Sequence, residues 1–249
     1  IPETSGEIAI KKPTVIDFKK AVTLTVGKSQ IINKSQLTIR GEGTMTATAN
    51  IITNEGKVTI DGGNFQATGT GDAAIVFNTG DVVINGGALE SNGHYAIQNN
   101  YGKSVTINGG SITSKGGNDY CLLMHGSGVL TVTSGTLTGN FGCGRLHEGT
   151  SATISGGEFI CNGQYYALFV GAYGTGVTAH VSGGKFRSTS TSAPNKCVYV
   201  GKNNTLDLTG GEFQNKGYDA NISGDIAPAA GYVFAGNDDP NYPFKVVAQ

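Results

Sequence analysis

The chain has 249 residues, of which 40 are glycine, none is tryptophan and 14% are charged. Its net charge of -1 comes from 17 basic and 18 acidic residues, so no overall field attracts nucleic acid or an anionic membrane. No apolar run approaches the roughly 20 residues that span a bilayer, and the N-terminal sequence lacks the apolar core of a signal peptide. We therefore expect no nucleic-acid partner and no membrane span.

Residues 1–36 carry six lysines and the run PTVIDFKKAVTLTVG. This composition is typical of a polar, partly irregular cover. Unpaired sheet edges need such covers because they invite aggregation. We predict an N-terminal cap over this range.

A sequence motif with a glycine pair follows the cap and recurs every 22 to 27 residues. Internal repeats of this period are typical of solenoids. A degenerate earlier copy is LTIRGEGTM, which contains Gly41. The clear copies, with the first glycine position in brackets, are VTIDGGNF (Gly62), VVINGGAL (Gly86), VTINGGSI (Gly109), LTVTSGTL (Ser134), ATISGGEF (Gly156), AHVSGGKF (Gly183) and LDLTGGEF (Gly210).

Apolar residues alternate before each glycine pair, as in Val58 and Ile60, and a second apolar series comes three residues after the first glycine position, as in Phe65. This period of two predicts two strands, each with one buried face, that meet at the glycine corner. A third strand precedes them in each repeat. Its predicted inward row is Ile75, Ile97, Leu122, the weak position Gly144, Leu168 and Val198, and its predicted outward row is Val76, Gln98, Leu123, Arg145, Phe169 and Tyr199.

Three short strands per repeat predict an all-β fold, a single-stranded right-handed parallel β-helix of about eight coils of 21 to 27 residues. A β-sandwich or propeller would need hairpin turns between the alternating runs, and the equivalent positions match at the coil period instead. Residues 37–226 form the predicted helix. The segment GYVFAGNDDPNYPFKVVAQ breaks the repeat, so we predict a C-terminal cap over 227–249 and one structural domain in all.

The TISGG-type coil over residues 37–226 resembles the right-handed β-helices of the pectate-lyase-like superfamily, and especially repeat proteins displayed on gut bacteria and carried by their phages. The resemblance implies a fold more than an activity, because that superfamily includes lyases, hydrolases, tailspikes, adhesins and inert shafts. Its lyases bind calcium through clustered Asp residues, and its hydrolases place several Asp on adjacent coils. This chain has no such carboxylate column, and Asn78-Thr79-Gly80 lacks the Asp of a polygalacturonase-like NTD. We therefore expect no cofactor, with calcium possible only for an enzyme of this kind.

One polar cluster is a candidate site. His125 and His147 occupy equivalent positions on adjacent coils, with Arg145 and Glu148 beside His147 and Asp119 on the other coil. Such a patch is suited to an acidic sugar, a divalent metal or a catalytic proton, so His125, His147 and Glu148 are the catalytic candidates. A plain polar turn ladder is the alternative, because Asn and His tolerate corner geometry, and Asn78 and Asn100 precede them in the expected row. Asp72, His94 and Asp119 form a similar column.

Aromatic side chains near the third strand are candidates for ligand binding. Tyrosines with small Ala or Cys residues between them suit a platform on which a sugar ring stacks, unless loops or another subunit cover them. Long loops at 171–180 and 187–197 mark the same region as a binding face. With the polar cluster, the predicted ligand-binding residues are Tyr95, Tyr120, His125, Arg145, His147, Tyr166 and Tyr199.

The cysteines match no zinc motif and no disulfide framework. Cys121, Cys143 and Cys197 share a repeat position with Ala74, Ala96 and Ala167, which indicates small packing residues. Cys161 stands where other repeats have Ala, Ser or Gly. Cys121 and Cys143 lie on adjacent coils and would bridge only if their geometry allowed it.

Two functions fit the sequence. The first is a non-enzymatic, extracellular display or binding protein, adhesin-like or glycan-binding, at a bacterial cell surface or in a phage virion. The second is a polysaccharide lyase or glycoside hydrolase that acts along a groove of the helix. An outward apolar strip of Val76, Leu123, Phe169 and Tyr199 also fits a homotrimer. An ice-binding surface would need an unbroken Thr ladder, and Val83, His180 and Asp207 interrupt it.

Overall fold

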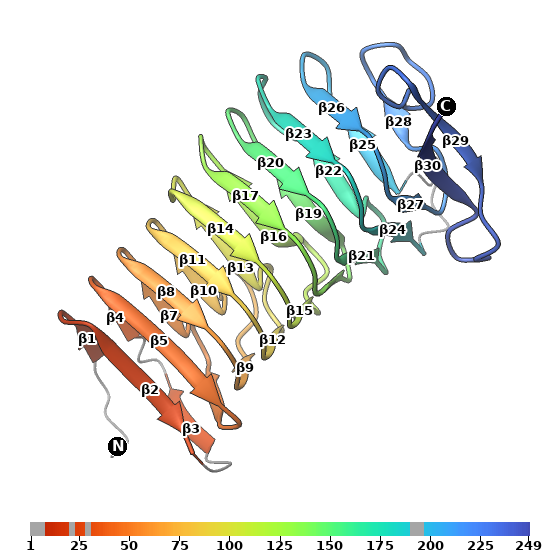
Figure 1. Ribbon diagram of the computed structural model, residues 1–249. Coiled ribbons are helices and arrows are strands. Elements are labelled where there is room, and N and C mark those ends of the chain that lie inside the picture. The colour runs from red at the N-terminus through yellow and green to blue at the C-terminus, as the bar shows by residue number, and fades with distance from the viewer. Residues whose placement is uncertain (1–7, 20–22, 28–30, 190–196) are drawn as a thin grey trace.

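A computed structural model describes residues 8–19, 23–27, 31–189 and 197–249. Every regular element in this part of the chain is a strand, and the strands stack in coils from the N-terminal to the C-terminal end (Figure 1). Three parallel sheets run along the stack, which is a right-handed parallel β-helix of about eight turns, as the repeats predicted. Parts of the predicted N-terminal cap and of the loop at 187–197 lie outside the described residues.

Sheet A contains the third strand of each predicted repeat. In order along the stack its strands are β1 (Ile8–Ile10), β4 (Ile31–Asn33), β7 (Ile52–Asn54), β10 (Val76–Asn78), β13 (Ile97–Asn100), β16 (Tyr120–His125), β19 (Gly142–Leu146), β22 (Leu168–Val170), β25 (Val198–Val200) and β28 (Tyr218–Asp219).

Sheet B contains the strand before each glycine corner. Its strands are β2 (Thr14–Phe18), β5 (Gln36–Gly41), β8 (Lys57–Ile60), β11 (Asp81–Ile84), β14 (Ser104–Ile107), β17 (Val129–Val132), β20 (Ser151–Ile154), β23 (Thr178–Val181) and β26 (Thr205–Leu208).

Sheet C contains the strand after each glycine corner and ends in an antiparallel hairpin. Its strands are β3 (Thr23–Gly27), β6 (Thr44–Ala47), β9 (Asn64–Ala67), β12 (Ala88–Ser91), β15 (Ser111–Ser114), β18 (Thr136–Gly139), β21 (Glu158–Cys161), β24 (Lys185–Ser188), β27 (Glu212–Phe213), β30 (Phe244–Ala248) and β29 (Tyr232–Gly236).

The core is a set of rows in which each apolar side chain packs on its equivalent one coil away. Phe159, Phe186 and Phe213 form such a row in sheet C, with ring centroids 5.0 and 5.1 Å apart and nearly parallel rings. Each is no more than 1% exposed. A single coil has no opposite layer to bury these rings, so stability comes from neighbouring coils.

The glycine corners between sheets B and C explain why the repeat keeps a glycine pair. The second glycine of each corner has a φ between 85° and 104°, a conformation that costs a side-chain-bearing residue energy. The first glycine lies against the backbone of the preceding coil without that φ, and there Ser134 replaces it. The second position is therefore the stricter one, and it is glycine in all seven clear copies: Gly63, Gly87, Gly110, Gly135, Gly157, Gly184 and Gly211.

A buried asparagine ladder lines the corner between sheets A and B in the first coils. Asn33 Nδ2 donates to Asn54 Oδ1 at 2.7 Å, Asn54 donates to Asn78 at 2.6 Å, and Asn78 donates to Asn99 at 2.6 Å. All four side chains are fully buried. They also bond the backbone of their corners, so the ladder satisfies groups that a buried turn would leave unpaired.

In one coil of sheet A, at β10, the predicted inward and outward residues are wrong by one position. Val76, not Ile75, pairs with Ile97 and points inward, and Phe77 occupies the outward row. Asn78 therefore aligns with Asn99 rather than with Asn100. The run AAIVFN is apolar at both parities, so periodicity could not fix its register. The predicted apolar strip is also wrong at Val76, which points inward, and at Leu123, which is only 6% exposed.

The first and last described coils close the stack. Strands β1, β2 and β3 already pair in parallel with β4, β5 and β6, so regular coils begin inside the range predicted as the N-terminal cap. At the other end, β30 pairs antiparallel with β27 and with β29, and it covers the last edge of sheet C. The cap boundaries themselves stay a prediction.

Candidate functional site

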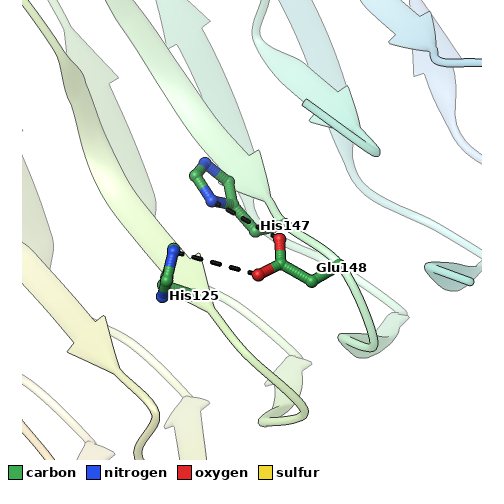
Figure 2. Close-up of side chains that lie close together, drawn as sticks. All are labelled: His125, His147 and Glu148. Atoms are coloured by element: carbon green, nitrogen blue, oxygen red, sulfur yellow. Dashed lines mark ion pairs between the residues drawn. The ribbon is translucent and has the colours of Figure 1, made fainter. Parts of the chain in front are cut away.

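The corner after β16 and β19 brings together three side chains predicted as candidates. His125 ends β16, His147 follows β19, and their ring centroids lie 4.9 Å apart. Glu148 Oε1 is 3.9 Å from His125 Nε2, and Glu148 Oε2 is 3.9 Å from His147 Nδ1. Figure 2 shows the carboxylate to one side of the two imidazoles and facing both. Met124 pairs with Leu146, so the next residues, His125 and His147, are equivalent on adjacent coils as predicted. Glu148 lies near both imidazoles and completes a cluster of three side chains.

His147 sits in an environment that disfavours its charged form. Only 8% of its side chain is exposed, and burial, followed by the nearby charges of Arg145 and His125, lowers its pKa to about 4. Neither ring nitrogen has a hydrogen-bond partner among the described residues. His147 is therefore a neutral imidazole with its lone pair available at neutral pH.

Arg145 does not contact the carboxylate of Glu148 but pairs with Asp119, at 2.7 Å. Both members of this pair are largely buried, at 13% and 16% exposure. Tyr95 also donates to Asp119, at 2.5 Å, and burial and this hydrogen bond raise the pKa of Tyr95. Asp119 thus binds the guanidinium of Arg145 and the phenol of Tyr95. The predicted column of Asp72, His94 and Asp119 is therefore split: His94 Nδ1 lies 3.2 Å from Asp72, and Asp119 has other partners.

The predicted tyrosines divide into covered and accessible ones. Tyr120 is 2% exposed and Tyr95 is 8% exposed, so neither ring offers a face to a ligand. Burial raises the pKa of Tyr120, whose hydroxyl has no partner among the described residues. Tyr166 and Tyr199 are half-buried, with ring centroids 4.8 Å apart.

An aromatic face extends over the outer side of sheet A in the last coils. Phe169, Tyr199 and Tyr218 are outward neighbours on β22, β25 and β28, and Tyr199 stacks on Tyr218 with centroids 5.6 Å apart. Tyr166 lies against both Phe169 and Tyr199. We call Tyr166, Phe169, Tyr199 and Tyr218 the aromatic face. Tyr218 was not predicted from the sequence, because β28 has only two residues and no glycine-pair motif follows it.

The aromatic face continues toward the polar cluster. Tyr165 packs on Phe141 at 4.2 Å, and the exposed Tyr173 places its ring 4.6 Å from the guanidinium carbon of Arg145 and 5.3 Å from the His147 ring. Tyr173 belongs to the predicted long loop at 171–180, which is described in full. Rings and a charged group therefore share one side of the molecule.

The four cysteines are free and buried. Burial raises the pKa of the Cys121 thiol to about 12 and that of Cys197 to about 11. Their Sγ atoms approach backbone carbonyls within the core. These thiols pack in the core, as predicted from their small equivalents, although Ile75 and not Ala74 is equivalent to Ala96.

A groove that the sequence reading missed runs along the glycine corners of the last coils. It has a volume of about 690 Å³ and is lined by glycine pairs and by Glu158, Lys185, Glu212 and Lys245. These charges alternate in sign along sheet C, and the first three belong to the successive repeat sequences GGEF, GGKF and GGEF. Lys185 Nζ lies 3.2 Å from Glu212 and 3.5 Å from Asp239, and Tyr242 donates to Glu158. Lys185 and Glu212 thus pair within the groove, and Lys185 and Glu158 contact the C-terminal segment through Asp239 and Tyr242.

Comparison with known proteins gives no match: no protein-family model, no curated protein and no solved structure is significantly similar to this chain. Among the described residues there is no helix of the length and apolarity that crossing a membrane requires.

Proposed function

We propose that the protein is a non-enzymatic, extracellular binding module that recognises a glycan on the aromatic face. The observation that carries this proposal is the run of half-buried rings of Tyr166, Phe169, Tyr199 and Tyr218 on the outer side of sheet A. Aromatic rings held by their neighbours offer apolar area at low entropic cost, and phenol hydroxyls at their edges bond polar ligands. Sugar rings present this combination of an apolar face and a polar rim.

The β-helix supplies the rigidity that such a platform needs. Phe169 and Tyr199 stand on strands that pair on both sides and Tyr218 on the last strand of the sheet, so the sheet sets the spacing of these three rings, and Tyr166 lies just before β22. Neighbouring strands lie about 4.8 Å apart, which is close to the length of one sugar unit. A linear polysaccharide that runs along the stack would meet successive rings.

Charge at the end of the aromatic face favours an acidic or strongly polar sugar. Arg145 lies beside Tyr173 and one strand before Phe169 in the outward row. Because Arg145 is already paired with Asp119, it attracts an acidic sugar only weakly and serves mainly to orient it. Display at a bacterial surface or on a phage particle is the setting that the coil's resemblance to pectate-lyase-like repeat proteins supports.

A glycan array with product analysis on acidic polysaccharides tests this function. We expect array binding without turnover. Release of unsaturated or shortened oligosaccharides would contradict a binding-only role and would favour a lyase or hydrolase. The oligomeric mass is measured in parallel, because a second copy packed on the aromatic face would hide the rings from a sugar.

A further inference from the structure

We infer that His125, His147 and Glu148 form a binding site for a divalent transition-metal ion of the zinc class. The inference does not depend on glycan binding, because none of the three residues belongs to the aromatic face. It also differs from the sequence expectation that the protein has no cofactor.

The donor set suits zinc chemically. Two imidazole nitrogens and one carboxylate are borderline ligands that Zn²⁺ accepts in sites with a fourth, open position. Calcium prefers six to eight oxygen ligands, and only Glu148 offers a carboxylate here. Thiols do not compete, because all four cysteines are buried in the core.

The imidazoles are unsatisfied without a further partner. Both ring nitrogens of His147, and Nδ1 of His125, are buried and lack a hydrogen-bond partner among the described residues. Buried polar atoms of this kind carry a desolvation cost unless an ion or a water bonds them. A carboxylate 3.9 Å from each imidazole is too distant for a direct hydrogen bond and leaves room for an ion between the three groups.

The distances lie close to those that a bound ion imposes. One ligand atom from each residue lies within 4.8 Å of the others. Tetrahedral zinc with bonds of about 2.0 to 2.1 Å places its ligand atoms about 3.3 Å apart, so the most separated groups must close by up to about 1.5 Å. Glu148 is 44% exposed and lies on a corner, so its side chain supplies this movement.

The surroundings hold the three groups in place. The Tyr101 ring packs on His125 at 4.6 Å, and the Tyr173 ring packs on His147. Gly174 lies against Glu148, where a Cβ would stand 2.6 Å from the glutamate Cβ. Arg145 is the nearby cation, and its ion pair with Asp119 offsets the charge that would repel a metal.

Calorimetric titration of the intact protein with Zn²⁺ alone tests the site. We expect one ion to bind, and we expect His147→Asn and Glu148→Gln to weaken the affinity at least about tenfold. His125→Asn with His147→Asn should abolish binding. Asparagine fits this row because Asn100 pairs with His125 on the preceding coil. Circular dichroism confirms that each variant keeps the β-helix.

His180→Asn is the matched control. His180 also meets a carboxylate, Asp207, at 2.7 Å, but has no second histidine beside it. This variant should bind zinc as the wild type does. The site is overturned if the wild type does not bind zinc, if the double variant binds it unchanged, or if His180→Asn loses it. Cobalt substitution adds a further check, since a thiolate-to-cobalt charge-transfer band would assign the ion to cysteine and also overturn the site.

Discussion

The two corners at the ends of sheet B are built by different means. The glycine corner between sheets B and C has three residues in each clear copy, from 61–63 to 209–211. The corner between sheets A and B varies along the stack. It covers 11–13, 34–35, 55–56, 79–80, 101–103, 126–128 and 147–150, is longest at 171–177, and shortens again to 201–204. One corner is held constant by backbone geometry, and the other varies in length and side chains.

This difference separates architecture from function. At the glycine corner the backbone of one coil touches the next so closely that side chains have little room. At the other corner the buried asparagine ladder ends at Asn99, where Met124 follows on the next coil, and the corner then lengthens to carry His147, Glu148 and Tyr173. Backbone contact is close at this corner too in the first coils, where a Cβ at Gly80 would stand 2.0 Å from the Gly56 carbonyl oxygen, so the variation falls in the later coils.

The largest effect is expected at the constant corner. Gly110 has a φ of 85°, and a Cβ there would stand 2.8 Å from the Gly87 carbonyl oxygen. Gly110→Ala should lower the free energy of unfolding by about 3 kcal/mol, through backbone strain and this clash. Urea denaturation measures the change.

Gly117→Ala is the control for that substitution. Nothing lies within 4 Å of a Cβ at Gly117, and its φ is not in the left-handed region. We expect it to change stability by less than about 0.5 kcal/mol. Equal losses for the two variants would show that glycine is not required by the corner geometry.

The asparagine ladder should give the next largest effect. Asn78→Ala removes the link between Asn54 and Asn99 and leaves buried amide groups unpaired. We expect a loss of about 2 kcal/mol in the free energy of unfolding. Asn85→Ala, in the exposed ladder with Asp61, should cost less than about 0.5 kcal/mol. If the two variants cost the same, the buried ladder does not close the varying corner.

The lengthened corner should tolerate change. Tyr173 is 65% exposed, and its ring contacts the side chains of Arg145 and His147 in the polar cluster. Tyr173→Ala should therefore cost less than about 1 kcal/mol in thermal or urea unfolding. A larger loss would mean that this corner is also part of the architecture.

Sequence reasoning predicted sheets B and C well because their pattern is local. Alternation such as Val105 and Ile107 fixes which face is buried, and the glycine pair fixes where the chain turns. Sheet A was harder. Ile75 and Val76 are both apolar and both buried, and the inward position was decided by Asn78, whose partners are 21 and 24 residues away.

The candidate site was predictable in part. Equivalent coil positions placed His125 beside His147, but the burial of Tyr120 depends on rings from other coils, such as Phe141 and Tyr165. The charged glycine-corner groove was missed, because its alternating charges are separated by a full coil. Tyr218 was missed because it follows the last regular repeat.

Affinity for an array-selected oligosaccharide, measured by calorimetry for two tyrosine variants, tests the central claim most directly. Tyr199 is at the centre of the aromatic face, and Tyr101 is an exposed tyrosine at the corner after β13. We expect Tyr199→Ala to weaken binding at least about tenfold, which corresponds to about 1.4 kcal/mol. Tyr101→Ala should leave it unchanged. Unchanged binding by Tyr199→Ala, with the fold intact, would contradict the assignment of function to the outer face of sheet A.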